Sequence, residues 1–219
     1  MKQVCVIGLG QFGTHLARTL VRLNCEVLVI DSDEQRIDEI RDQVHRAIVG
    51  DARNYELLAG TLSDTVDDAV VALGAASIEP SILCVLNLAK IGVAHIRSTA
   101  RNDDHAQILR AVGATEIIFP EQESAERTAR RVANPDLLDM FPLAEDYRIM
   151  EMVAPHKYHG KTLAEANLRR EFDLLVLAVH EKGEERYHFL PRADTIIKPD
   201  EVLMVLGREL DLARFAGLD

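Results

Sequence analysis

Short apolar runs alternate with helix-spaced apolar positions along the first two-thirds of the chain. The runs are continuously apolar, as in strands covered on both faces, and they predict strands at residues 3–9, 26–31, 46–49, 68–73, 94–98 and 116–119. After each run, apolar residues recur three or four positions apart. This spacing predicts helices at residues 12–23, beyond residue 33, and at 55–59, 82–90, 105–112 and 125–132. Six strand-then-helix units in succession predict an α/β fold with a doubly wound parallel sheet.

The pattern changes near residue 134. The turn signal Asn134-Pro135-Asp136 opens a stretch with a further proline and two acidic residues, which predicts a linker over residues 135–146 and makes it the candidate hinge. Beyond the linker, strands are predicted at 148–153, 174–179, 186–189 and 202–206, with helices at 162–167 and 209–215. We therefore expect an α/β domain at residues 1–134 and a small α+β domain at residues 147–219.

The 219-residue chain carries a formal net charge of −11. DNA phosphates and anionic lipid headgroups repel an acidic protein, so the charge argues against binding to nucleic acid or directly to a membrane surface. The three cysteines, Cys5, Cys25 and Cys84, lie far apart in apolar runs, as expected of buried free thiols in a reducing cytoplasm. No apolar stretch reaches the ~18 residues of a membrane span, so we expect any action at a membrane to run through a partner.

A glycine-rich motif, Gly8-Leu9-Gly10-Gln11-Phe12-Gly13, joins the first predicted strand to the first helix. In a Rossmann-type domain the first glycine permits the tight turn, the second lets the backbone approach a pyrophosphate, and the third lets helix and strand pack closely. The free N–H groups at the start of the helix would face the phosphates. Asp31 ends the second strand, where a carboxylate accepts hydrogen bonds from ribose hydroxyls and disfavours the 2′-phosphate of NADP. The alternative is a structural glycine turn, with Asp31 capping the next helix.

Three further strand ends are expected at the same edge of the sheet, where open parallel sheets bind their ligands. They carry the segments Gly50-Asp51-Ala52, Gly74-Ala75-Ala76 and Thr99-Ala100-Arg101-Asn102. The small residues of the second segment leave room for a base or a ribose. Asp51 could instead cap a helix, and Arg101 could form a surface ion pair rather than contact a phosphate.

Glu121 opens the last helix of the α/β domain. A carboxylate at this place could bind a hard cation beside nucleotide phosphates. The alternative is that Glu121 only stabilises the positive N-terminal end of the helix.

The order of these segments resembles a known family. Similarity to the RCK (TrkA-N) domain is carried by GLGQFG, VIDSDEQRI, VGDARNYELL, VALGAASIEPSI, STARNDDH and VGATEIIFPE, and similarity to its companion TrkA-C domain by HGKTLAEANLRREFDLLVLAVHEKG and IIKPDEVLMVLG. The resemblance covers nearly the whole chain and points to the KtrA/TrkA type of potassium uptake regulator. It implies a cytoplasmic regulatory subunit rather than an enzyme. Such subunits form homodimers that assemble into an octameric ring, which docks at the inner face of the membrane on a potassium-translocating subunit of the KtrB/TrkH type and gates it as nucleotides exchange.

The resemblance also assigns roles to individual positions. Gly8, Gly10 and Gly13, with Gln11 and Phe12 between them, would hold the phosphates, and Asp31 would hold the ribose. The other positions that would line the pocket are Ser32, Asp33, Asp51, Ala52, Gly74, Ala75, Thr99 and Arg101. Glu121 matches an acidic residue near the nucleotide and an activating divalent cation. The implied ligands are ATP and ADP, as in the KtrA branch, or NAD and NADH, as in the TrkA branch. The segment with Asn167 and Arg169 resembles the cyclic-dinucleotide site of some members.

Three positions depart from the pattern of KtrA-type sequences. Gln11 stands where arginine is usual, Asp33 where asparagine is commoner, and Thr99 where some relatives have lysine. The lost positive charge weakens the case for ATP and leaves ADP, AMP and NAD(H) open.

Two other functions stay open as well. One is an NAD-dependent oxidoreductase, with His180 or His188 as its base, and the other is a nucleotide sensor of a different cation transporter, such as a cation/proton antiporter.

Overall fold

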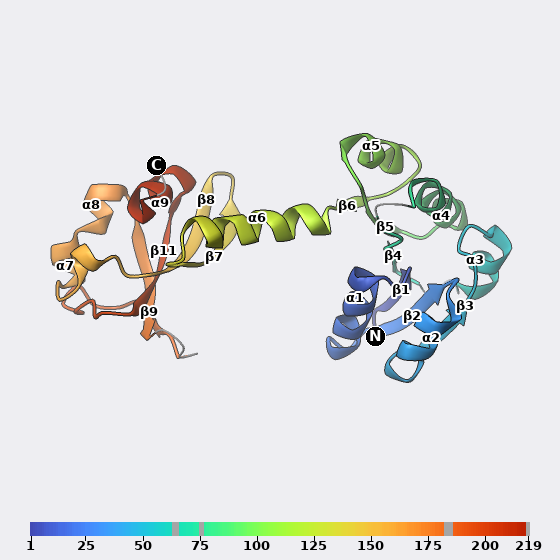
Figure 1. Ribbon diagram of the computed structural model, residues 1–219, viewed down its shortest axis with the longest axis horizontal. Helices are drawn as coiled ribbons and strands as arrows, with labels where there is room; N and C mark the ends of the chain where they lie inside the picture. The colour runs from blue at the N-terminus through green and yellow to red at the C-terminus, as the bar shows by residue number, and fades with distance from the viewer. Residues whose placement is uncertain (63–65, 75–76, 182–185, 218–219) are drawn as a thin grey trace. The chain divides into compact units, whose positions relative to one another are not determined.

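The computed structural model describes residues 1–62, 66–74, 77–181 and 186–217. The chain divides into two compact units, Met1–Gln122 and Glu123–Asp219 (Figure 1). Each unit has a hydrophobic core of its own. The boundary between the units falls inside helix α6, Pro120–Ala133.

The N-terminal unit is built on a six-stranded parallel sheet. Its strands are β1 (Gln3–Ile7), β2 (Glu26–Asp31), β3 (Arg46–Val49), β4 (Asp68–Val71), β5 (His95–Thr99) and β6 (Glu116–Ile118). The strand order β3-β2-β1-β4-β5-β6 and the parallel pairing of all neighbours confirm the predicted doubly wound, Rossmann-type fold. The order reverses at β1, so the crevice in which such sheets bind ligands lies at the carboxyl ends of β1 and β4.

Helices follow the strands as α1 (Gln11–Arg22), α2 (Glu34–Ile40), α3 (Tyr55–Thr61), α4 (Ile78–Ile91) and α5 (Asp103–Ala111), with a short 3-10 helix at Arg41–Gln43. The side chains of Asp33, Asn54 and Asn102 accept hydrogen bonds from first-turn N–H groups of α2, α3 and α5 and so fix where these helices begin. Helix α4 begins earlier than the predicted residue 82. Pro80 falls in its first turn, where a missing N–H removes no helical hydrogen bond.

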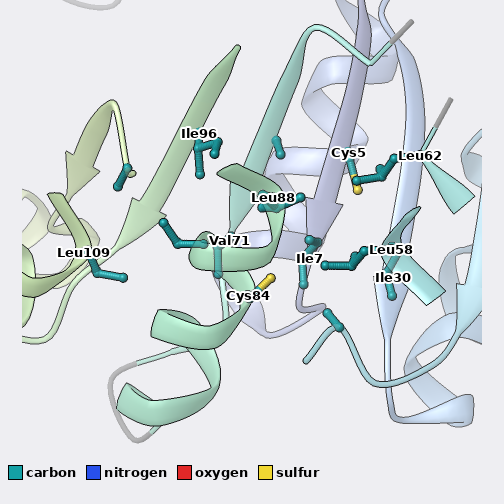
Figure 2. Close-up of a cluster of buried hydrophobic side chains, with 14 of the residues drawn as sticks. Cys5, Ile7, Ile30, Leu58, Leu62, Val71, Cys84, Leu88, Ile96 and Leu109 are labelled. Atoms are coloured by element: carbon teal, nitrogen blue, oxygen red, sulfur yellow. The ribbon is translucent and has the colours of Figure 1, made fainter. Parts of the chain in front are cut away.

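Successive strand residues pack against helices on opposite faces of the sheet. In β1, Cys5 and Ile7 belong to a buried cluster that includes side chains of α3, α4 and α5, and Figure 2 shows them pointing into it. Val4 and Val6 belong to a second cluster, with side chains of α1 and α2. Burial on both faces explains why these strands are continuously apolar in the sequence.

The C-terminal unit contains an antiparallel sheet in the order β10-β9-β11-β8-β7. Its strands are β7 (Leu137–Ala144), β8 (Tyr147–Val153), β9 (Leu175–Glu181), β10 (His188–Phe189) and β11 (Glu201–Arg208). The helical segments are a 3-10 turn at His156–Tyr158 and the helices α7 (Leu163–Ala166), α8 (Leu168–Phe172) and α9 (Glu209–Ala216). Met150, Leu203 and Leu212 are fully buried where this sheet and these helices share a core.

The linker predicted over residues 135–146 differs most from the structure. Leu137–Ala144 is strand β7, which pairs with β8 in a hairpin that turns at Glu145-Asp146. Strand β7 lies at the edge of its sheet, and an edge strand tolerates Pro142 because the missing N–H can face away from the neighbouring strand. The prediction of an irregular linker was therefore wrong, and the candidate hinge lies within regular structure.

Helix α6 is 14 residues long, yet none of its described residues is buried. A helix of this length gains most of its stability in a protein by burying one face, so α6 lacks that stabilisation within the single chain. Within the described ranges, no helix combines the length and the apolarity needed to cross a bilayer.

Candidate nucleotide site

The turn between β1 and α1 requires glycine at two positions and leaves open space at a third. Gly8 adopts φ +96°, and a Cβ there would lie 2.5 Å from the carbonyl oxygen of Ala72. A Cβ on Gly13 would overlap the carbonyl oxygen of Gly8. Because glycine has no Cβ, α1 can begin directly against the end of β1. A Cβ on Gly10 would meet nothing within 4 Å. The turn therefore has the three glycine roles that a pyrophosphate-binding loop requires.

The N-terminus of α1 is free to bind an anion. Gly10 is the N-cap, no side chain caps the first turn, and no acidic residue lies in that turn. The first N–H groups of a helix have no partner within the helix, and the helix dipole places partial positive charge beside them. Together with the open space beside Gly10, these groups have the geometry in which helix N-termini bind phosphate in other proteins.

Asp31 fixes the glycine loop to the end of β2. Its carboxylate is almost fully buried and accepts the N–H of Leu9 at 2.5 Å and the N–H of Asp33 at 2.9 Å. A guanidinium nitrogen of Arg36 lies 3.7 Å from the same oxygen that accepts the Leu9 N–H. The carboxylate is thus held rigidly at the wall of the cavity, where the predicted ribose contact would be made.

A cavity of about 280 Å³, here named the glycine-loop cavity, opens beside this loop. It brings together nine of the predicted site residues: Gly8, Gly10, Gln11, Phe12, Asp31, Ser32, Gly74, Thr99 and Glu121. These residues come from the ends of β1, β2, β4, β5 and β6, which meet at one edge because the strands are parallel.

A second cavity of about 300 Å³, here named the β3-side cavity, contains the predicted residues Asp51 and Ala52. It shares four lining residues with the glycine-loop cavity: Asp31, Ser32, Leu73 and Ser77. Asp51 does not cap α3, because Asn54 does so. Its carboxylate pairs with Arg53 at 2.6 Å, and the hydrogen bond from the Arg53 side chain holds the pKa of Asp51 below its usual value.

Three predicted residues are not among the described residues that line either cavity. Gly13 serves the packing of α1 on β1. Asp33 turns its carboxylate to the N–H of Gln35 as the N-cap of α2. Arg101 has an exposed side chain. Ala75 lies outside the described residues, and in the C-terminal unit Asn167 and Arg169 are both exposed at the junction of α7 and α8.

Arg36 and Ser77 are among the lining residues that the sequence reasoning missed. Arg36 is the one basic residue among the described residues of the glycine-loop cavity, and Ser77 lines both cavities. Arg36 also lies 3.4 Å from the carboxylate of Asp33. Its position three residues after that N-cap was the available signal, because residues three apart on a helix are neighbours.

Glu121 lines the glycine-loop cavity at the start of α6. Among the described residues, no group of three or more histidine, cysteine or acidic side chains is placed to hold a metal ion. A divalent cation at Glu121 would therefore take its other ligands from nucleotide phosphates and water. This is the usual coordination of Mg²⁺ beside a nucleotide, so the residues present fit such an ion only together with its nucleotide.

Comparison with known proteins identifies both parts of the chain. The family model of the TrkA-N domain matches residues 4–120, and that of the TrkA-C domain matches residues 148–218. The chain is 32% identical to the Ktr system potassium uptake protein C of Bacillus subtilis (strain 168), over 98% of this chain and 96% of that protein. It is 31% identical to the Ktr system potassium uptake protein A of Vibrio alginolyticus, over 97% of this chain and 95% of that protein.

A solved structure of the GsuK channel bound to NAD has the same fold. It matches with a TM-score of 0.64 at 19% identity, over 98% of this chain and 38% of the channel chain. This chain thus spans less than half the length of that channel. The two domain matches and the identity to the Ktr proteins over nearly the whole length show that the chain belongs to the RCK family, with a TrkA-N domain followed by a TrkA-C domain.

Proposed function

We propose that this chain is the nucleotide-binding regulatory subunit of a potassium uptake system. Its relatives over nearly the whole chain are Ktr system potassium uptake proteins. It would act in the cytoplasm, at the inner face of the cell membrane, on a membrane subunit that translocates potassium. A nucleotide that binds one conformation more tightly would shift the subunit toward it and thereby open or close the partner.

The observation that carries the nucleotide part of the proposal is the uncapped N-terminus of α1 beside the open space at Gly10. Phosphates would bind there, on the side of the glycine-loop cavity. The ribose would donate hydrogen bonds to Asp31, which both cavities share. The adenine base would then occupy the β3-side cavity, between Ala52 and Pro80.

Charge around the glycine-loop cavity favours a diphosphate over a triphosphate. Asp31 and Glu121 are acidic, whereas Arg36 is its one basic lining residue within the described part of the chain. Gln11 and Thr99, at positions where some relatives carry cations, are neutral. A third phosphate would add negative charge near these carboxylates, which costs free energy unless a divalent cation at Glu121 offsets it. ADP, AMP and NAD(H) therefore fit the bare site, and ATP would need the cation.

Helix α6, none of whose described residues is buried, supports the proposed homodimer. Its last turns carry Val132, whose side chain is 76% exposed, and the neighbouring β7 exposes Phe141 and Leu143. Large apolar side chains exposed together are typical of protein interfaces. We propose that a second copy covers α6 and that such dimers assemble into the ring.

The oxidoreductase alternative has only carboxylates as proton-transfer groups among the described residues of the site. Among the described residues that line either cavity there is no histidine, lysine, cysteine or tyrosine. His180 and His188 lie in β9 and β10 of the C-terminal sheet. The other alternative, a sensor for a different cation transporter, differs only in its partner, and co-purification of the membrane subunit would identify that partner.

A thermal-shift screen of nucleotide-stripped protein against ADP, AMP, NAD, NADH and ATP, with and without Mg²⁺, tests the ligand. A ligand that binds only the folded chain raises the melting temperature by mass action. We expect a rise with ADP or NAD(H), and a rise with ATP only when Mg²⁺ is present. Potassium flux through the co-purified membrane subunit in liposomes tests the function. Flux that does not change when nucleotide is bound would contradict the regulatory role.

A further inference from the structure

His105, at the start of α5, is buried, with 3% of its surface exposed, and both ring nitrogens lie within hydrogen-bond distance of a partner. Its Nδ1 is 3.2 Å from the backbone nitrogen of Arg101, whose N–H points to it. Its Nε2 is 2.9 Å from the hydroxyl oxygen of Ser81 in α4. The Ser81 hydroxyl oxygen also lies 2.8 Å from the carbonyl oxygen of Ile78.

These contacts determine the protonation state of the ring. A backbone N–H can only donate, so Nδ1 must accept the hydrogen bond from Arg101 and cannot carry a proton. The neutral ring then carries its proton on Nε2, and this N–H donates a hydrogen bond to the hydroxyl oxygen of Ser81. The Ser81 hydroxyl is left to donate to the carbonyl oxygen of Ile78. Each donor in this series of three hydrogen bonds has one acceptor. A doubly protonated ring would lose the hydrogen bond from the Arg101 N–H, because Nδ1 could no longer accept it.

The hydrogen-bond chain ties together two walls of the candidate site. Arg101 directly follows Thr99 and Ala100, which line the glycine-loop cavity after β5. Ile78 directly follows Ser77, which lines both cavities. His105 itself lines neither cavity, so it can act on a ligand only by holding these two segments in place.

We propose that His105 and Ser81 are positioning residues of the nucleotide site: the neutral ring holds the segment after β5 against the start of α4, and protonation of the ring loosens that wall and weakens nucleotide binding at acid pH. This inference rests on the nucleotide-binding function proposed above. It predicts a regulation of that site by pH that passes through a residue without ligand contact.

The surroundings of the ring favour its neutral form at neutral pH. Burial lowers the pKa of His105 below its ordinary value of 6.5. The ring also sits in the first turn of α5, where the positive end of the helix dipole opposes a second positive charge. No described carboxylate forms an ion pair with it. The charged and titratable residues on the elements around it are Glu79 and Lys90 of α4, His95 and Arg97 of β5, the exposed Arg101 of the loop, Asp103, Asp104 and Arg110 of α5, and Glu116 of β6. Arg97 and Glu116 pair with each other.

Three variants of the full chain separate positioning from simple packing. In His105→Asn the amide oxygen can accept the Arg101 N–H but cannot titrate. His105→Phe fills the space without an acceptor, and Ser81→Ala removes the link to α4. His95→Asn, at the exposed start of β5, is the matched control for the loss of a titrating histidine.

Calorimetry with ADP between about pH 5.5 and about pH 8, the range in which histidine titrates, measures binding. The wild type and His95→Asn are expected to lose about three- to tenfold in affinity toward the acid end, the worth of one hydrogen bond. His105→Asn should lose clearly less over the same range, and His105→Phe should bind about three- to tenfold more weakly at every pH. The inference is overturned by parallel pH profiles for the wild type and His105→Asn, or by wild-type affinity in His105→Phe.

Amide exchange and imidazole ¹⁵N shifts provide a readout that needs no ligand. We expect a proton on Nε2 and an Arg101 amide that exchanges slowly in the wild type and His105→Asn but faster in His105→Phe. A proton on Nδ1, or an exchange rate of the Arg101 amide that is the same in His105→Phe as in the wild type, would contradict the positioning role whether or not a nucleotide binds. Failure of the wild type to bind any nucleotide would instead contradict the proposed function.

Discussion

Replacing Gly10 by alanine separates ligand binding by the glycine loop from its folding. The backbone of Gly10 has φ −66°, an ordinary value for any residue, and a Cβ there would meet no atom within 4 Å. The same substitution at Gly8 or Gly13 would drive a Cβ into backbone atoms. We therefore expect Gly10→Ala to fold, with its methyl group in the space through which a phosphate reaches the first turn of α1.

The two costs of this substitution can be compared. Hydrogen bonds from N–H groups to a charged phosphate contribute about 1.5–3 kcal/mol each. A methyl group that pushes the phosphate away from one N–H should therefore cost about 2 kcal/mol of binding, or about 30-fold in Kd. Alanine is a poorer N-cap than glycine, which should lower the free energy of unfolding by about 0.5–1 kcal/mol. The binding loss should thus exceed the stability loss.

Titration calorimetry with ADP measures the binding loss, with Gly60→Ala as the control. Gly60 is exposed in α3, and a Cβ there would also meet nothing within 4 Å. This control should bind ADP like the wild type and gain about 1 kcal/mol of stability, because glycine is unfavourable inside a helix. An unchanged Kd for Gly10→Ala would refute the placement of the phosphates at this turn.

Three further outcomes are expected. Arg53→Ala should raise the pKa of Asp51 back toward 3.8, which an NMR titration measures. The small stability that this exposed pair adds is fully present above pH 3.8 and is lost as the pH falls through the lowered pKa of Asp51, so the stability difference between the variant and the wild type should disappear at lower pH. Leu203→Ala removes a fully buried side chain of the C-terminal core and should cost about 2–5 kcal/mol in denaturant unfolding of that unit, while ADP binding by the N-terminal unit persists. Asp68→Asn should cost about 1.5–3 kcal/mol in denaturant unfolding of the N-terminal unit, because it removes a buried carboxylate that pairs with Lys2 and Arg97, whereas the exposed Asp67→Asn should change little.

The parallel sheet could be predicted from the sequence because its strands are buried on both faces and therefore read as unbroken apolar runs. Strand β7 could not be predicted in this way. Only Leu137 at its start is buried, its last four residues are exposed, and Pro142 interrupts it. This strand forms because its backbone pairs with β8 along one edge. Backbone pairing with a neighbouring strand requires no alternation of apolar and polar residues, so it cannot be recognised from the sequence of β7.

The places of the glycine loop and of Asp31 beside the cavity were predictable because each lies at the carboxyl end of a strand in a parallel sheet. The roles of other side chains depend on direction, which sequence spacing does not determine. Asp33 follows β2 directly after the cavity residue Ser32, yet its carboxylate turns to cap α2. His105 ends the STARNDDH segment, but the resemblance assigns it no role, and its importance follows only from partners in α4 and in the loop after β5.

Asp31 offers a physical route by which a ligand could act on α2. The N–H of Leu9 lies 2.5 Å from one carboxylate oxygen, whereas Arg36 lies 3.7 Å from the same oxygen. A ribose hydroxyl that donates to Asp31 should therefore displace the longer and weaker contact with Arg36 and leave the loop attached through Leu9. Arg36 would keep its ion pair with Asp33, the N-cap of its own helix. Helix α2 would therefore lose the contact that joins it to Asp31 and, through Asp31, to the glycine loop. We expect ADP to speed amide exchange in α2 while the Leu9 amide stays protected, and the reverse pattern would show that the ribose does not bind at Asp31.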